Sequence, residues 1–140
     1  MIRHSKLPQD ILDRIHDAAD YLKTRHDVIF AYLFGGLAKS EPKPLSDVDI
    51  AVYLTEETVW AQAKAEIIEK LVDILHTDEI DLIILNQSSL SLSMNILKHN
   101  RLLLDKEPFT RHLYHSLIMR KYFEYSQFES ALLKRRLYNG

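Results

Sequence analysis

Two short segments, separated by a glycine pair and a polar loop, constrain the fold of this chain more than any other feature. Residues 28–34 are apolar and lead directly into Gly35 and Gly36. After a loop that contains prolines, residues 47–54 alternate between polar and apolar side chains. Short runs of this kind, bounded by glycine and proline, are typical of β-strands. The sequence therefore predicts a strand, a tight turn, a loop and a second strand.

The second predicted strand carries two carboxylates. Side chains alternate between the two faces of a strand, so Asp47 and Asp49 share one face and the apolar residues share the other. Two carboxylates roughly 6–7 Å apart along a strand disfavour each other's ionisation unless a cation lies between them. Magnesium prefers oxygen ligands and is commonly held by one or two carboxylates together with substrate phosphates. The pattern therefore predicts a magnesium site.

The glycine pair predicts an anion-binding turn. Without a Cβ atom, Gly35 and Gly36 can adopt positive φ and allow another group to approach, so their N–H groups can turn toward an anion. A helix that begins at Gly36 or Leu37 would add free N–H donors and the positive end of its dipole. Lys39 could add positive charge at bound phosphates, although a solvated lysine is the simpler interpretation.

The spacing of these residues resembles the signature of the nucleotidyltransferases of the polymerase-beta superfamily. That signature is Gly-Ser, ten residues and Asp-x-Asp, and here Gly35 and Gly36 are followed by ten residues and then by Asp47 and Asp49. The chain departs from it at Gly36, where the family has a serine that helps to hold the nucleotide phosphates. The resemblance implies an α/β fold with a small mixed sheet of three to four strands, flanked by helices, and a C-terminal helical segment.

A third carboxylate lies in the apolar segment 79–85. A nearly continuous apolar run predicts a central strand that is buried on both faces, where a carboxylate is costly unless it is paired or ligated. The family resemblance also implies a third metal-facing carboxylate on a strand beside the Asp-x-Asp strand. We therefore expect Asp81 to join Asp47 and Asp49 as a catalytic residue and metal ligand. The alternative is a solvated carboxylate at the entrance of the strand.

The remaining segments show mostly helical periodicity. We expect one domain over residues 1–140, because the chain is long enough for one core and too short for two ordinary domains. The spacing of apolar residues predicts helices over 11–22, 55–76 with Thr55 as N-cap, 88–100, and 108–137 as one or two helices. Residues 101–105 fit a short edge strand.

The segment 106–140 differs from the rest of the chain in charge and aromatic content. Residues 1–96 carry 9 basic and 16 acidic side chains, a net charge of −7, whereas residues 97–140 carry 9 and 4, a net charge of +5. More than half of the aromatic residues lie beyond position 106. Aromatic and arginine enrichment is typical of interfaces, so we expect this C-terminal helical extension to contact a partner. The alternative is a helix that packs on the core and presents a solvated basic face.

Composition excludes several other classes of protein. The chain has no cysteine, so a disulfide framework and a thiolate metal site are impossible. It shows neither a signal-peptide pattern nor an apolar run long enough to span a bilayer. We expect a cytoplasmic protein without a membrane partner. Direct nucleic-acid binding is not expected, because the basic excess is modest and no recognised binding motif is present.

Within the superfamily, the chain most resembles the minimal nucleotidyltransferases, the MNT-domain antitoxins that are paired with HEPN-domain ribonuclease toxins. The resemblance implies Mg²⁺-dependent transfer of AMP from ATP to a tyrosine hydroxyl of the toxin, which silences it. Gly36 would remove one hydrogen bond to the phosphates, a loss of about 1.5–3 kcal/mol. Two alternatives stay open. One is a non-catalytic antitoxin that occludes its toxin, and the less favoured one is an aminoglycoside-type nucleotidyltransferase, whose extra substrate domain this chain could hardly accommodate.

Overall fold

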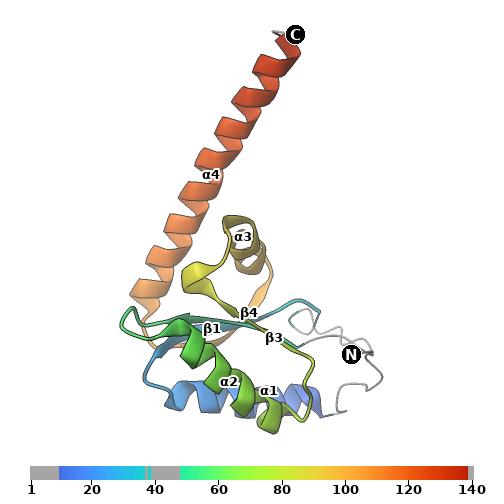
Figure 1. Cartoon of the computed structure of the whole chain (residues 1–140), viewed down its shortest axis with the longest axis vertical. Coiled ribbons are helices and arrows are strands. Elements are labelled where there is room, and N and C mark those ends of the chain that lie inside the picture. The colour runs from blue at the N-terminus through green and yellow to red at the C-terminus, as the bar shows by residue number, and fades with distance from the viewer. Residues whose placement is uncertain (1–9, 37, 39–47, 139–140) are drawn as a thin grey trace.

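The structure is a computed structural model, and it describes residues 10–36, 38 and 48–138. Helices lie on both sides of a single sheet, and the last helix projects far beyond it (Figure 1). The elements in chain order are α1 (Ile11–Thr24), β1 (Val28–Phe34), β2 (Val48–Leu54), α2 (Trp60–Leu75), β3 (Ile80–Ile84), the 3-10 turn η1 (Leu85–Gln87), α3 (Leu90–Lys98), β4 (Asn100–Asp105) and α4 (Pro108–Tyr138). None of the described helices is long and apolar enough to span a membrane.

The described strands form a mixed four-stranded sheet in the order β3-β2-β1-β4. β1 pairs antiparallel with β2 and with β4, while β2 pairs parallel with β3. Parallel neighbours need a crossover connection, and α2 supplies it. The predicted small mixed sheet flanked by helices is confirmed, and β4 is the edge strand expected near residues 101–105.

Each face of the sheet has its own core. Helices α1 and α2 pack on one face, where buried Leu22 and Leu71 meet Ile50 of β2 (Figure 1). Helix α3 and the beginning of α4 pack on the other face, where buried Tyr114 lies in the same cluster as Phe30 of β1. Because side chains alternate along a strand, β2 directs its large aliphatic residues toward α1 and α2. It directs its remaining residues toward the side of α3 and α4.

The prediction that residues 79–85 form a central strand with Asp81 buried in it is wrong. β3 is an edge strand, and Asp81 is exposed. The run is apolar for a different reason, because both faces of this edge strand are covered. Leu82 and Ile84 pack with α1 and α2, and Ile83 packs against the core on the opposite face.

Helix α2 begins later than predicted. Its N-cap is Val59 rather than Thr55. The Thr55 and Thr58 hydroxyls are 2.6 Å apart in a hydrogen bond, and the Thr58 backbone N–H donates to the Thr55 carbonyl. Threonine side chains that bond within a turn compete with helix initiation, so the segment makes a turn before the helix starts.

Helix α4 is a single helix of 31 residues, and its first turns pack against the body of the domain. Tyr114 and Ile118 are buried against the sheet. Nearby, the Tyr32 hydroxyl and His115 Nε2 are 2.8 Å apart, and Arg111 Nε donates to an Asp105 carboxylate oxygen at 2.8 Å. Burial lowers the pKa of His115, with the positive charge of Arg111 acting in the same direction. These contacts fix the direction in which the rest of α4 leaves the body.

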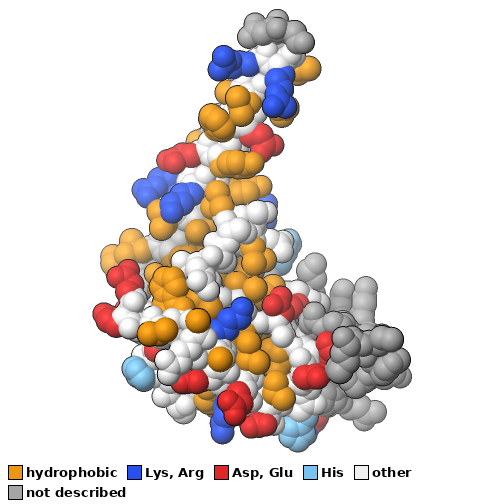
Figure 2. Space-filling model, in the orientation of Figure 1, with side chains coloured by type: hydrophobic (Ala, Val, Ile, Leu, Met, Phe, Trp, Pro, Cys, Tyr) orange, Lys and Arg blue, Asp and Glu red, His pale blue; other side chains and the backbone are white. Residues whose placement is uncertain are grey.

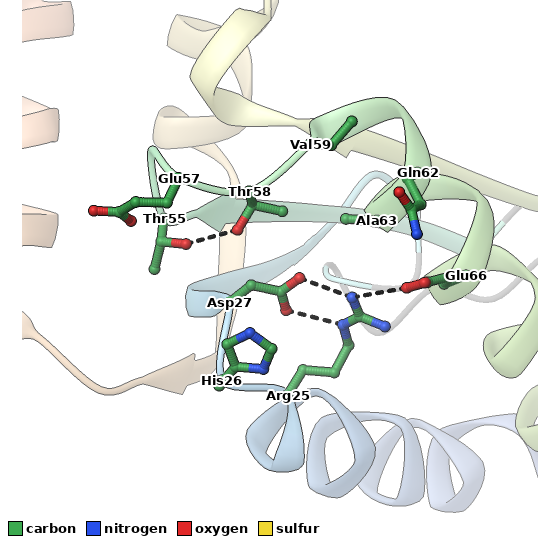
Figure 3. Close-up of a pocket in the computed structure, with 10 residues that line it drawn as sticks. All are labelled: Arg25, His26, Asp27, Thr55, Glu57, Thr58, Val59, Gln62, Ala63 and Glu66. Carbon is green, nitrogen blue, oxygen red and sulfur yellow. Dashed lines mark hydrogen bonds and ion pairs between the residues drawn. The ribbon is translucent and has the colours of Figure 1, made fainter.

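A partly buried ion pair lies just before β1. Arg25 donates from two guanidinium nitrogens to Asp27, at 2.9 and 2.7 Å, and also reaches Glu66 at 3.4 Å (Figure 3). The Asp27 side chain is almost inaccessible to solvent, and its backbone carbonyl accepts from the Thr55 N–H, which links β1 to the end of β2. The hydrogen bond from Arg25 holds the pKa of Asp27 below its ordinary value of 3.8.

We predict that Asp27→Asn destabilises the domain at pH 7 by about 2 to 3 kcal/mol, because the buried charge-assisted bonds are lost. A carboxyl with a lowered folded-state pKa stabilises above its ordinary pKa of 3.8 and loses that contribution as pH falls through the folded value. The difference from the parent should therefore shrink below pH 3.8. Urea unfolding at several pH values measures it, with the exposed Asp17→Asn as control. A difference that does not depend on pH would contradict the assignment.

Candidate active site

Two carboxylates meet on neighbouring strands. The parallel register of β2 and β3 places Asp49 directly beside Asp81. Adjacent strands are separated by about 4.8 Å, and paired residues share a face of the sheet. Both side chains therefore lie on the side covered by α3 and α4. Asp49 is half-buried and Asp81 is exposed, so the pair opens toward solvent at β3.

Gly35 lies against one of these carboxylates. It has φ of 74°, and a Cβ atom placed on it would collide with Oδ2 of Asp49. Its neighbour in the chain, Phe34, is the β1 partner of Asp49 in the antiparallel register. Only glycine combines this left-handed backbone with such a close approach at low cost. The turn that follows β1 is therefore built around the Asp49 carboxylate, and Gly36 continues it as an exposed residue.

The remaining predicted site residues lie outside the described residues. These are Asp47, predicted as a metal ligand, and Lys39, predicted at the phosphates. Among the residues that the structure does describe, no group of three or more histidine, aspartate or glutamate side chains is arranged to hold a metal ion. The structure thus brings together Gly35, Asp49 and Asp81, and the roles assigned to all six predicted site residues stay predictions.

The chemistry of this arrangement fits a hard divalent cation. Carboxylate oxygens are the ligands that Mg²⁺ prefers. The Gly35 backbone lies against the Asp49 carboxylate, at a position where any larger residue would collide with it. Mg²⁺ usually keeps several waters and binds through one or two protein carboxylates. The Asp49–Asp81 pair would therefore supply the protein ligands that such a site needs.

Two further residues, which the sequence pattern did not single out, complete this row across the sheet. Phe34 pairs with Asp49 on one side and with Asn100 of β4 on the other. The Asn100 side-chain amide donates to the carbonyls of Ile96 and Leu97, both at 3.1 Å. This closes the C-terminal end of α3 beside the site. An asparagine directly after an amphipathic segment is a common helix-end signal, and it could have indicated this position.

A comparison with protein families identifies the superfamily. The family described as polymerase beta nucleotidyltransferase matches residues 16–109, which span α1 to the start of α4 and include all the predicted site residues. The chain belongs to this nucleotidyltransferase family. No curated protein sequence is significantly similar to it.

Solved structures with the same fold come from toxin–antitoxin complexes. A chain of a toxin–antitoxin complex with AMP-PNP superposes with a TM-score of 0.71 at 21% identity, over 87% of this chain and 98% of that one. A chain of the complex between a tri-AMPylated Shewanella oneidensis HEPN toxin and its MNT antitoxin gives a TM-score of 0.66 at 20% identity, over 89% and 98%. A chain of the MntA–HepT complex gives 0.65 at 21% identity over the same shares. These likenesses confirm the minimal nucleotidyltransferase fold.

We predict that Gly35→Ala destabilises the domain by about 1–2 kcal/mol from the left-handed backbone alone, with an added cost from the collision with Asp49. Truncating that carboxylate removes the collision but not the backbone cost. The same substitution in an Asp49→Ala background should therefore cost less. Urea unfolding of the four proteins of this double-mutant cycle measures the coupling. Equal costs in the two backgrounds would contradict the close approach of Gly35 to Asp49.

Proposed function

We propose that the chain is an antitoxin that transfers AMP from ATP to a tyrosine hydroxyl of a HEPN ribonuclease toxin and thereby neutralises it. The observation that carries the proposal is the Asp49–Asp81 carboxylate pair beside the Gly35 turn, within a nucleotidyltransferase fold. The fold likeness to complexes with AMP-PNP and with a tri-AMPylated HEPN toxin supports the choice of nucleotide and partner.

The proposed reaction is a single displacement at phosphorus. The tyrosine oxygen attacks the α-phosphorus of ATP and forms the new P–O bond. The bond between the α-phosphorus and the oxygen that bridges to the β-phosphorus breaks, and pyrophosphate leaves with the bonding electrons. The hydroxyl proton passes to a carboxylate. Asp81 suits this role because it is the exposed member of the pair, on an edge strand that an acceptor side chain can approach.

The other site residues would bind and orient the nucleotide. Asp47, Asp49 and Asp81 would hold Mg²⁺, which when bound neutralises charge on the triphosphate. The backbone N–H groups of Gly35 and Gly36 would donate to phosphate oxygens. Lys39 would add a positive charge at the phosphates.

Gly36 favours a second candidate function. Without the family's serine hydroxyl, this chain would hold phosphates less tightly, so it could neutralise its toxin by occlusion without transferring AMP. A nucleotidyltransferase that acts on small molecules is less favoured. The structural relatives, which this chain covers almost to their full length, are chains of toxin–antitoxin complexes.

We predict that Asp49→Asn and Asp81→Asn each lower AMP transfer by about 100-fold or more, as expected for the loss of a carboxylate that binds metal or accepts a proton. The intact mass of the toxin after incubation with the chain, ATP and magnesium measures the transfer. Asp73→Asn removes an exposed carboxylate from α2, on the opposite side of the sheet, and is the matched control. Undiminished transfer by the Asp49 and Asp81 variants would refute the catalytic assignment.

We predict that Gly36→Ser increases AMP transfer by about tenfold or more at limiting ATP, because one hydrogen bond to a charged phosphate contributes about 1.5–3 kcal/mol. The same mass measurement on the toxin tests this. Transfer by the serine variant alone would identify this chain as a disabled AMP-transferase. If neither protein modifies the toxin but both inhibit it, the occluding antitoxin is correct.

A further inference from the structure

The outer part of α4 is an arm that leaves the body of the domain (Figure 1). Every side chain from Met119 to Leu137 is exposed, and hydrophobic side chains follow the arm over much of its length (Figure 2). Lys98 Nζ lies 5.5 Å from the ring centroid of Tyr122, at the base of the arm. Beyond Tyr122, the described residues show no hydrogen bond or ion pair between the arm and the body. Most of the stability of a helix in a protein comes from packing of one of its faces, so a covering partner would stabilise the arm.

One side of the arm continues the stripe by which α4 packs on the body. Tyr114 and Ile118 are buried against the sheet, and Tyr125, Phe128 and Leu132 follow at spacings of three, four or seven residues. That pattern is the seam of a helix that packs along another helix. The three outer residues are 55%, 63% and 39% exposed, although they are as apolar as the two buried ones. The seam therefore runs from a covered section into an uncovered section.

A hollow at the base of the arm extends this surface. It has a volume of about 400 Å³ and is lined by Tyr53 and Trp60 on the body and by Leu117 and Lys121 on α4. Tyr53 is on the same face of β2 as Asp49, four residues or about 13 Å along the strand. A partner seated on the arm and in the hollow would thus lie on the side of the sheet that carries the carboxylate pair.

The charge of the arm indicates the chemistry of its partner. Residues 119–137 carry five basic and two acidic side chains. Two copies of the arm side by side would bring like charges together, which disfavours a dimer of this chain. An apolar helix with acidic side chains along its edges would complement both the seam and the charge.

We propose that the seam residues Tyr125, Phe128 and Leu132, together with the hollow at their base, dock an amphipathic, acid-edged helix of the toxin. The identity of the partner rests on the proposed function. Helix-in-groove recognition of this kind depends on apolar anchors spaced by three, four and seven residues. Docking here would hold the toxin beside the face of the site and raise the local concentration of its acceptor tyrosine.

The test is toxin binding by the full chain with Tyr125, Phe128 and Leu132 all changed to alanine. We expect affinity to fall by about 100-fold, because buried aromatic anchors dominate interface energies. Met119, Phe123 and Leu137 lie on the opposite side of the same helix and are 55%, 63% and 81% exposed. Their triple alanine variant is the matched control and should bind within about threefold of the parent, since rim contacts contribute little. Titration calorimetry measures both.

The charge complementarity between the basic arm and the acidic edges of the toxin helix is tested separately. Arg135 and Arg136 follow Leu132 by three and four residues, so they flank the seam. Arg135→Glu combined with Arg136→Glu should weaken toxin binding most at low salt, because exposed charges are screened as ionic strength rises. The free energy of unfolding of the body should be the same in all these variants as in the parent, because the arm projects from the body. Equal affinity of the parent and the seam variant would overturn the proposal, and so would equal losses in the seam and control variants. If the parent chain forms a dimer and the seam substitutions dissociate it, the seam binds a second copy of this chain instead.

AMP transfer separates this proposal from the catalytic one. The seam variant keeps the carboxylate pair, so it should modify the toxin at saturating toxin concentration, whereas Asp81→Asn should bind the toxin normally and not modify it. If the parent transfers no AMP but the seam variant still loses binding, the docking surface is correct and the enzyme assignment fails. If the seam variant transfers AMP with an unchanged KM for the toxin, the docking surface is wrong and the enzyme assignment holds.

Discussion

The parallel register between β2 and β3 is the constraint on which the candidate site depends. A shift by one residue would turn every side chain of β3 to the other face, and Asp81 would then point toward α1 and α2. Packing fixes this register, because Leu82 and Ile84 are buried in the core that α1 and α2 cover. Burial of two aliphatic side chains thus determines where an exposed carboxylate lies. The core packed on one face of the sheet therefore fixes where the carboxylates lie on the opposite face.

The close approach of Gly35 to Asp49 adds a second level of control. A left-handed backbone at the end of β1 bends the chain over the carboxylate, at a place where only a missing Cβ avoids a collision. The same turn begins the segment that the family uses for phosphates. The turn and the carboxylate are therefore coupled, so a substitution at Gly35 or at Asp49 should shift the other residue.

The two faces of the sheet are packed with different kinds of side chain and have different roles. The face under α1 and α2 is a continuous aliphatic core. Beside it, the Thr55 backbone N–H donates to the Asp27 carbonyl and links the start of β1 to the end of β2. The face under α3 and α4 is aromatic, with Phe30 stacked on Tyr53 at 4.8 Å and Tyr114 beside them. Because only the first turns of α4 complete this second core, the rest of the helix is available to a partner. This division places the proposed docking surface and the carboxylates on one side of the molecule.

The amino-acid sequence by itself determined the local features: the glycine turn, the alternation that puts Asp49 on the face opposite Ile50, and the succession of helices and strands. These depend on backbone freedom and on periodicity within a few residues. Only the tertiary structure decided that β3 is an edge strand, that Asp81 is exposed beside Asp49, and that α4 leaves the body after Ile118. An edge strand covered on both faces has the same apolar pattern as a central one. The order of strands and the contact between Tyr32 and His115 depend on packing between residues far apart in the chain, which local periodicity does not encode.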